Sequence, residues 1–150
     1  MRNLTKLSAM LSLVLMMSPV AVVTADVFDV DVGPGGAIVF EPSDLVIEVG
    51  DSVRWTWDSG GHNVGSGLPG APTPFFLSGP PDVSGTIFEV LFDQAFLDAN
   101  PAPGGVYDYH CHPHGDFGMI GTVTVVPEPA ALLMLGIAGI FTMNRRCRVK

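Results

Sequence analysis

Basic side chains are almost absent from the middle of this 150-residue chain. Residues 26–127 contain fourteen Asp and Glu residues against a single base, Arg54, so this stretch carries a formal charge of -13. Nucleic acid carries dense negative charge and would be repelled by such a surface. We therefore expect no nucleic-acid partner.

Cysteine is also scarce, with Cys111 in the middle of the chain and Cys147 near its end. Residues 26–127 therefore cannot hold a disulfide framework. A lone cysteine in an exported domain serves as a nucleophile or a metal ligand, or else it is an inert buried thiol. The composition alone leaves these alternatives open.

Residues 1–25 have the composition of a signal peptide that is removed before Asp26. Two basic residues come first, an apolar run from Leu7 to Val23 follows, and small residues precede the expected cleavage point. Ser18-Pro19 interrupts the run and argues against a permanent membrane anchor. We therefore expect the protein to be exported from the cytoplasm.

Residues 128–150 form a second expected targeting segment. Fourteen apolar residues, Ala130 to Met143, would make a helix of about 21 Å, which is short for a hydrocarbon core of about 30 Å. A Pro-Glu-Pro sequence at 127–129 precedes this run, and an Arg-rich end follows it. This order resembles the PEP-CTERM sorting tail of Gram-negative bacteria.

The resemblance implies that an exosortase-type processing enzyme cleaves the tail near residues 127–129. Basic residues hold the end of such a segment on the cytoplasmic side, so the apolar helix would contact the inner membrane transiently. The protein would then pass from the periplasm to the cell surface or the extracellular matrix. A plain tail anchor is the alternative.

The remaining 102 residues, 26–127, suffice for one domain and exclude a multidomain enzyme. Turn sequences rich in glycine and proline separate short runs in which apolar and polar residues alternate. These features predict an all-β domain, a Greek-key β-sandwich or barrel of about seven to eight strands. The predicted strands are Val27–Val32, Ala37–Phe40, Leu45–Val49, Ser52–Trp57, Thr86–Phe92, Val106–Cys111 and Gly121–Val126.

Two segments of this domain lack the strand pattern. Residues 65–85 contain five prolines, which predicts that they wrap the outside of the sandwich and form no central strand. Asp93–Ala99 is predicted to form a short helix before Pro101.

Alternation along the strands also predicts which side chains face the core. Trp55 and Trp57 share one face of their strand, and core packing is sufficient to explain them. Tyr107 and Tyr109 are expected to point inward, whereas His110 should point the other way.

The strongest chemical signal lies in Tyr107–Gly121, a segment that places several soft donor atoms in one loop between two strands. Cys111, His114 and Met119 supply a thiolate, an imidazole and a thioether. A trigonal copper site needs one thiolate and two imidazoles, with a weak methionine sulfur on the axis. His62 is the only histidine outside this loop and is the candidate for the second imidazole.

These residues resemble the copper loop of a plastocyanin-type cupredoxin. Two residues separate Cys111 from His114, and four separate His114 from Met119, as in that family. His62-Asn63-Val64 is similar to the upstream histidine motif of the family. The resemblance covers nearly all of residues 37–126.

This resemblance implies a type 1 (blue) copper protein with the cupredoxin fold. His62, Cys111 and His114 would be the strong ligands of one copper ion, and Met119 would be the weak axial ligand. Asn63 would brace the loop by hydrogen bonding near the cysteine sulfur. Soft sulfur ligands suit Cu(I) and imidazoles suit Cu(II), so the set serves both oxidation states.

His110 and His112 flank the cysteine, and this triplet resembles the one in multicopper oxidases. There the flanking histidines bind a second copper cluster. Such a cluster needs many more histidines than the four in this chain. We therefore predict that both are solvent-facing or loop histidines, with adventitious or regulatory metal binding as the alternative.

The function implied by the resemblance is that of a one-electron carrier, which is not an enzyme. Redox partner proteins would dock near His114, where Pro113, Gly115, Phe117 and Gly118 are candidates for an apolar docking patch. The acidic surface would steer a partner with a basic docking surface.

Two other functions fit parts of the sequence. The sorting tail is compatible with a cell-surface or matrix protein that uses the domain for copper sequestration or adhesion. A small-molecule oxidase fits less well, because four protein ligands leave no open metal position.

Overall fold

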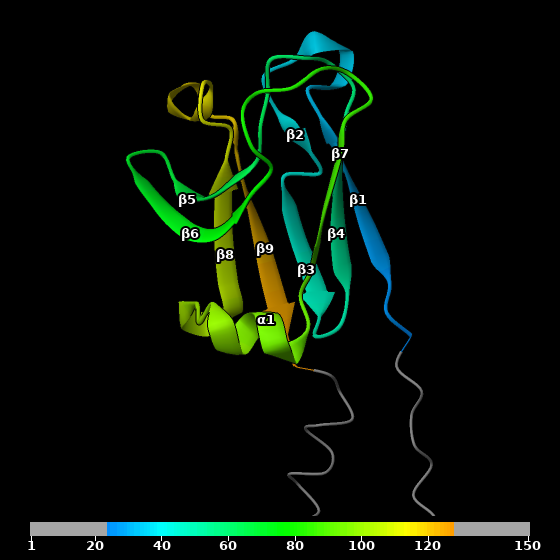
Figure 1. Cartoon of the computed structure of the whole chain (residues 1–150), viewed down its shortest axis with the longest axis vertical. Helices are drawn as coiled ribbons and strands as arrows, with labels where there is room; N and C mark the ends of the chain where they lie inside the picture. Colours follow the sequence, from blue (N-terminus) through cyan, green and yellow to red (C-terminus); the bar gives the residue numbers. More distant parts are fainter. Residues whose placement is uncertain (1–23, 128–150) are drawn as a thin grey trace, which may run out of the picture.

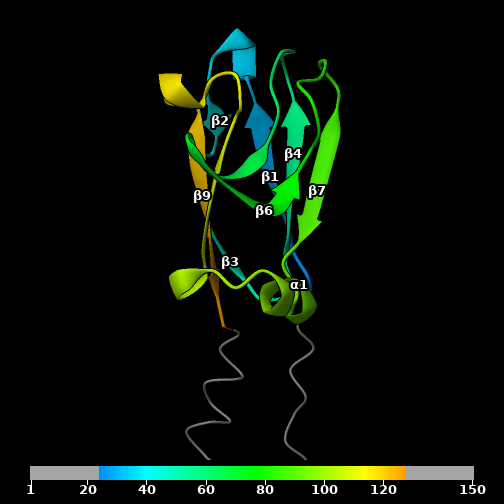
Figure 2. The same cartoon turned by 60° about the vertical axis from the view of Figure 1, so that its left-hand side comes forward.

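A computed structural model describes residues 24–127, which form a β-sandwich of two mixed sheets (Figures 1 and 2). Of the predicted signal peptide (1–25) only Thr24 and Ala25 lie within this range, and the predicted sorting segment (128–150) lies outside it. None of the helices in this range has the length and apolar character required to cross a membrane.

The first sheet has the strand order β2-β1-β4-β7. Its long inner pair is parallel, with Val27 of β1 opposite Ser52 of β4 and Val32 opposite Trp57. The neighbours on either side, β2 and β7, run antiparallel to this pair. The bounds are β1 Val27–Val32, β2 Phe40–Glu41, β4 Ser52–Trp57 and β7 Ile87–Leu91.

The second sheet has the order β3-β9-β8-β5-β6 and faces the first (Figure 2). β3 and β9 are parallel, and the other neighbours are antiparallel. β8 and β9 are joined by the loop that holds most of the predicted metal ligands. The bounds are β3 Asp44–Glu48, β5 Gly65–Leu68, β6 Ala71–Leu77, β8 Val106–His110 and β9 Ile120–Val126.

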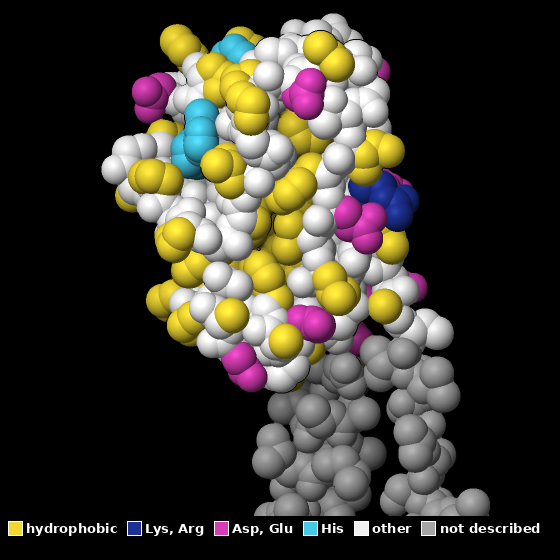
Figure 3. All heavy atoms as spheres, in the orientation of Figure 1, with side chains coloured by type: hydrophobic (Ala, Val, Ile, Leu, Met, Phe, Trp, Pro, Cys, Tyr) yellow, Lys and Arg dark blue, Asp and Glu magenta, His cyan; other side chains and the backbone are white. Residues whose placement is uncertain are grey.

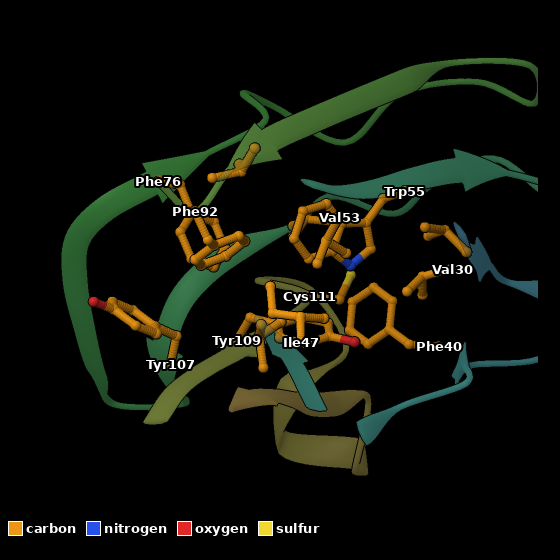
Figure 4. Packing of buried hydrophobic residues seen from close by; sticks show 14 of the residues in the cluster. Val30, Phe40, Ile47, Val53, Trp55, Phe76, Phe92, Tyr107, Tyr109 and Cys111 are labelled. Atoms are coloured by element: carbon orange, nitrogen blue, oxygen red, sulfur yellow. The ribbon is translucent and has the colours of Figure 1, made fainter. Parts of the chain in front are cut away.

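Large aromatic side chains from both sheets fill the space between them (Figure 4). Trp55 and Trp57 of β4 are 0% and 1% exposed, which confirms that they pack in the core. Tyr107 and Tyr109 of β8 are buried too, and the Tyr109 ring meets Trp55 edge-on with centroids 5.4 Å apart. Burial of one such ring removes roughly 150–250 Å² from water, which is worth about 4–6 kcal/mol of transfer free energy.

Nine strands are present in residues 24–127, more than the seven to eight predicted, because residues 65–85 contain two of them. The prediction that this stretch holds no central strand is wrong, since β5 lies between β8 and β6. β5 itself contains no proline and pairs with β8 at only two positions. Pro72 and Pro74 fall in β6, an edge strand, where a missing N–H costs no ladder hydrogen bond.

The predicted strand Ala37–Phe40 is also wrong for its first three residues. Pro34–Gly36 forms a tight 3-10 turn, in which Gly35 and Gly36 have positive φ. The Gly33 N–H then donates to the Val39 carbonyl at 3.0 Å, which closes a loop where a strand was predicted.

The short helix before Pro101 is confirmed as α1, Gln94–Ala99. Asp93 caps its first turn, because the carboxylate accepts a hydrogen bond from the Phe96 N–H at 2.7 Å. The Phe96 ring contacts Phe92 of the core. α1 lies at one end of the sandwich and the β8–β9 loop lies at the other (Figure 1).

Asp51, a buried residue, ties the start of β1 in the first sheet to β3 in the second. Its carboxylate accepts hydrogen bonds from the N–H groups of Asp26, beside β1, and Glu48, in β3, at 2.9 and 2.8 Å. We expect Asp51→Ala to lower the free energy of unfolding by about 1–3 kcal/mol, because two partly buried N–H groups lose a charged acceptor. Urea denaturation measures this change, with Asp31→Ala, at an exposed position in β1, as the control. Equal stability of the two variants would contradict the assigned role.

Candidate metal centre

The predicted ligands come from two connections at the end of the sandwich opposite α1. His62 lies in the connection that follows β4, where the Trp57 indole N–H donates to its carbonyl at 2.7 Å. Cys111 directly follows β8, and His114 and Met119 lie further along the β8–β9 loop. The core tryptophan therefore fixes the backbone of the one predicted ligand that is distant in sequence.

Three potential donor atoms converge between these connections. The Cys111 sulfur lies 3.8 Å from His62 Nδ1 and 3.4 Å from His114 Nδ1, and the two nitrogens are 3.1 Å apart. A point about 2.0 Å from each corner of this triangle exists, close to the 2.0–2.3 Å that nitrogen and sulfur donors keep from a bound metal ion. The residues thus fit a single ion without rearrangement of the backbone.

Met119 is held beside the other two loop residues. The Cys111 N–H donates to the Met119 carbonyl at 3.1 Å, and the Met119 N–H donates to the His114 carbonyl at 3.2 Å. Gly118, with φ of +92°, makes the reversal that directs the chain back to Met119. The Met119 side chain is fully buried.

The side chain of Asn63 joins the segment after β4 to the β8–β9 loop. Its Oδ1 accepts from the His112 N–H at 2.7 Å, and its Nδ2 donates to the Gly79 carbonyl at 2.9 Å. Asn63 is 1% exposed, and both bonds are partly buried. Asn63 therefore holds the residue after Cys111 against the segment that carries His62.

Burial shapes the protonation of the candidate ligands. Burial raises the pKa of the Cys111 thiol, and hydrogen bonds from the backbone N–H groups of Asn63 and His114 counter this in part. Burial, followed by the charge of His114, lowers the pKa of His62. A neutral imidazole offers a lone pair to a metal, whereas the thiol must release its proton on binding.

The donor set is suited to copper. It combines one sulfur and two imidazoles with a buried thioether nearby, and soft and borderline donors of this kind select copper over hard, oxygen-seeking cations. Among the residues that the structure describes, no carboxylate belongs to this cluster.

Two predictions about neighbouring loop residues are wrong. His110 is 5% exposed rather than solvent-facing, because the β8–β9 loop folds back over it and Gly115 packs on its ring. Gly115 is buried for the same reason and is not part of an exposed patch. His112 is exposed, as predicted. Strand alternation showed that His110 leaves the main core, but it could not show that a loop covers that face.

We expect Asn63→Ala to loosen the loop and to lower the free energy of unfolding by about 1–3 kcal/mol, because the partly buried His112 N–H and Gly79 carbonyl lose their partner. Hydrogen exchange of the His112 amide would become faster. Asn100→Ala is a matched control, since Asn100 Nδ2 donates to the Phe96 carbonyl at the distant end of the sandwich. Unchanged protection of the His112 amide in Asn63→Ala would contradict the bracing role.

Comparison with known proteins gives an independent result. The family model for copper binding proteins of the plastocyanin/azurin family matches residues 82–126. Plastocyanin from Scenedesmus fuscus is 33% identical over 100 residues, which cover 60% of this chain and 89% of that protein.

Plastocyanin from Nostoc punctiforme is 30% identical over 132 residues, covering 78% of this chain and 89% of the relative. A putative pseudoazurin from Rhizobium leguminosarum bv. viciae is 34% identical over 116 residues, which cover 76% of this chain and 68% of that protein. The His-Cys-His cluster and these similarities agree on copper as the cofactor, in a site consistent with one type 1 ion. The chain therefore belongs to the plastocyanin family of copper-binding proteins.

Proposed function

We propose that this protein is an exported one-electron carrier whose copper ion is held by His62, Cys111 and His114, with Met119 as a weaker ligand. Bound copper supplies the redox chemistry, because it accepts and releases one electron between Cu(II) and Cu(I). The observation that carries the proposal is the triangle of one sulfur and two Nδ1 atoms, whose sides are 3.1–3.8 Å. Membership of the plastocyanin family supports it further.

Rigid positioning of the ligands favours electron transfer over other chemistry. Trp57 fixes the His62 carbonyl, Asn63 fixes the His112 N–H, and backbone bonds join Cys111 to Met119. Ligands held in this way change little when the charge of a bound ion changes. A site with four protein ligands leaves no open position for a substrate, so we propose no enzymatic activity.

Electrons would enter and leave at the end of the sandwich where His114 lies. His62 and Cys111 are buried, whereas His114 is half-buried and so lies nearest to solvent among the three. Phe117, on the same loop, is 77% exposed, and Pro113 of this loop is exposed too. Figure 3 shows histidine and apolar side chains together at this end of the molecule. A redox partner protein that docks here would approach the copper through the His114 ring.

The targeting segments predicted from the sequence place this carrier outside the cytoplasm. We propose passage to the periplasm through the signal peptide, followed by exosortase-type processing and transfer to the cell surface or matrix. The same tail favours copper sequestration at the surface as a second candidate function. Reversible electrochemistry of the copper protein would support a carrier, whereas tight Cu(I) binding without reoxidation would support sequestration.

The copper site can be tested by titrating the full chain with Cu(II). We expect an intense blue thiolate-to-copper absorption band and narrow copper hyperfine splitting in electron paramagnetic resonance, both saturating at one equivalent. Cys111→Ser should lose both, because the serine oxygen is not a soft, easily oxidised donor. A pale spectrum that is the same in Cys111→Ser would show that the histidines bind copper without the thiolate, and the carrier proposal would fail.

The acidic surface predicts opposite salt effects for small redox reagents of opposite charge. The formal charge of residues 26–127 is -13, so a cationic cobalt or ruthenium complex should react several-fold more slowly when salt rises from about 10 mM to 0.5 M. An anionic iron complex should react faster over the same range. Stopped-flow loss or recovery of the blue band measures both rates. Identical salt dependence for the two reagents would refute electrostatic steering.

A further inference from the structure

The imidazole of His110 is not a candidate ligand of the first copper site, yet its orientation suits metal binding. Its Nδ1 lies 2.6 Å from the Gly67 carbonyl oxygen, which can only accept, so Nδ1 carries the proton. The lone pair of the neutral ring is then on Nε2. Histidines that bind metals commonly donate their other N–H to a backbone carbonyl in this way, which fixes the tautomer and the ring.

An irregularity in β5 provides this acceptor. The pairing of β5 with β6 shifts register between Gly65 and Gly67, and Gly67 has φ of +92°. Bulges of this kind redirect groups away from the ladder. Here the Gly67 carbonyl is directed at the His110 ring, and Gly115 packs on the other side of that ring.

His112 lies over the same part of β5. Gly65 pairs with His110 in the sheet, and any Cβ at Gly65 would collide with His112 Nε2. The absence of a side chain at position 65 therefore makes room for the second imidazole next to the first.

The two rings have almost the same spacing as the pair in the copper site. The His110 and His112 centroids are 5.0 Å apart at an interplanar angle of 40°. The His62 and His114 centroids are 4.8 Å apart at 55°. The two imidazole pairs therefore have similar ring spacing. The Cys111 sulfur contacts the His62–His114 pair.

A cavity of about 340 Å³ opens beside the second pair. Asp116, an exposed residue, contributes to its wall from the 3-10 turn Gly115–Phe117. The cavity is lined by Pro69, Gly70, Pro72, His110, His112 and Asp116.

We propose that His110 Nε2, His112 and the Asp116 carboxylate form a second metal site, distinct from the first, that takes a divalent ion such as Cu(II) or Zn(II). Imidazole and carboxylate ligands without a thiolate suit these borderline ions, and Cu(II) binds such donors most tightly in the first transition series. The cavity leaves room for water to complete the coordination. The ion would lie next to the backbone of Cys111 but would not contact its sulfur.

The experiment is a titration of the full chain with Cu(II) beyond the first equivalent. The blue band reports the first site, and a second resonance signal with wide hyperfine splitting and nitrogen couplings from two imidazoles would report the second. We expect the wide signal to grow between one and two equivalents. His112→Gln should abolish it or weaken the second binding constant at least about tenfold, while the blue band persists.

Three further variants separate the proposed site from other binding. His110→Gln retains a donor for the Gly67 carbonyl but loses the imidazole, and it should behave like His112→Gln. Asp116→Asn should weaken the second equivalent, whereas Asp31→Asn, a matched change at an exposed carboxylate on β1, should not. Saturation at one equivalent in the unaltered chain would overturn the proposal. A wide signal that is unchanged in both histidine variants would also overturn it, since the ion would then be adventitious. Loss of the blue band alone would reject the first site and not the second.

Discussion

The contact between the connection after β4 and the β8–β9 loop is the constraint on which the rest of this structure depends. His62 and Cys111 are 49 residues apart, and two hydrogen bonds help to fix their relative position, one within the first segment and one between the two segments. The Trp57 indole holds the His62 carbonyl, and the Asn63 carboxamide holds the His112 N–H. The first bond is buried and the second is partly buried, and burial strengthens hydrogen bonds by excluding water. Without them the imidazole of His62 would have no fixed position relative to the sulfur.

The aromatic core provides the rigid base for this contact. Trp55, Phe76, Phe92 and Tyr109 interlock between the sheets, and Tyr109 also donates through its hydroxyl to the Ser43 carbonyl. β4 and β8 emerge from this packed interior directly into the two connections that carry the ligands. Close packing allows few alternative side-chain arrangements, so the candidate ligands are positioned without a bound ion. This rigidity suits the one-electron carrier that we propose.

The acidic side chains of this domain are not among the candidate copper ligands. Residues 26–127 carry fourteen carboxylates, yet the His-Cys-His cluster includes none of them. The negative charge can therefore act on approaching partners through solvent, while sulfur and nitrogen alone determine which metal is held. Asp116 is the acidic residue on the loop itself, and it lines the cavity on the side of His110 and His112.

The sequence by itself determined the fold class, the core positions Trp55 and Trp57, and the candidate ligands Cys111, His114 and Met119, because alternation and donor spacing are local properties of the chain. His62 was a candidate because it is the only histidine outside the loop segment and because its surroundings resemble the family motif. Strand existence was predicted well for β1 and β4, whose boundaries agree with the structure. The structure of segments that depend on contacts with distant residues could not be predicted from the local sequence pattern. β5 forms because β8 offers it a neighbour, and residues 37–39 close a loop because glycines before them adopt positive φ.

The tertiary structure alone decided the environment of His110. Alternation directs this side chain away from the main core, and only the folded β8–β9 loop, with Gly115 against the ring, shows that it is buried. The tertiary structure likewise decided that His112 lies over Gly65, at a spacing from His110 that matches the ligand pair. The physical reason is the same in both cases. The surroundings of these side chains depend on segments from elsewhere in the chain that pack against them, and a local sequence pattern does not contain that information.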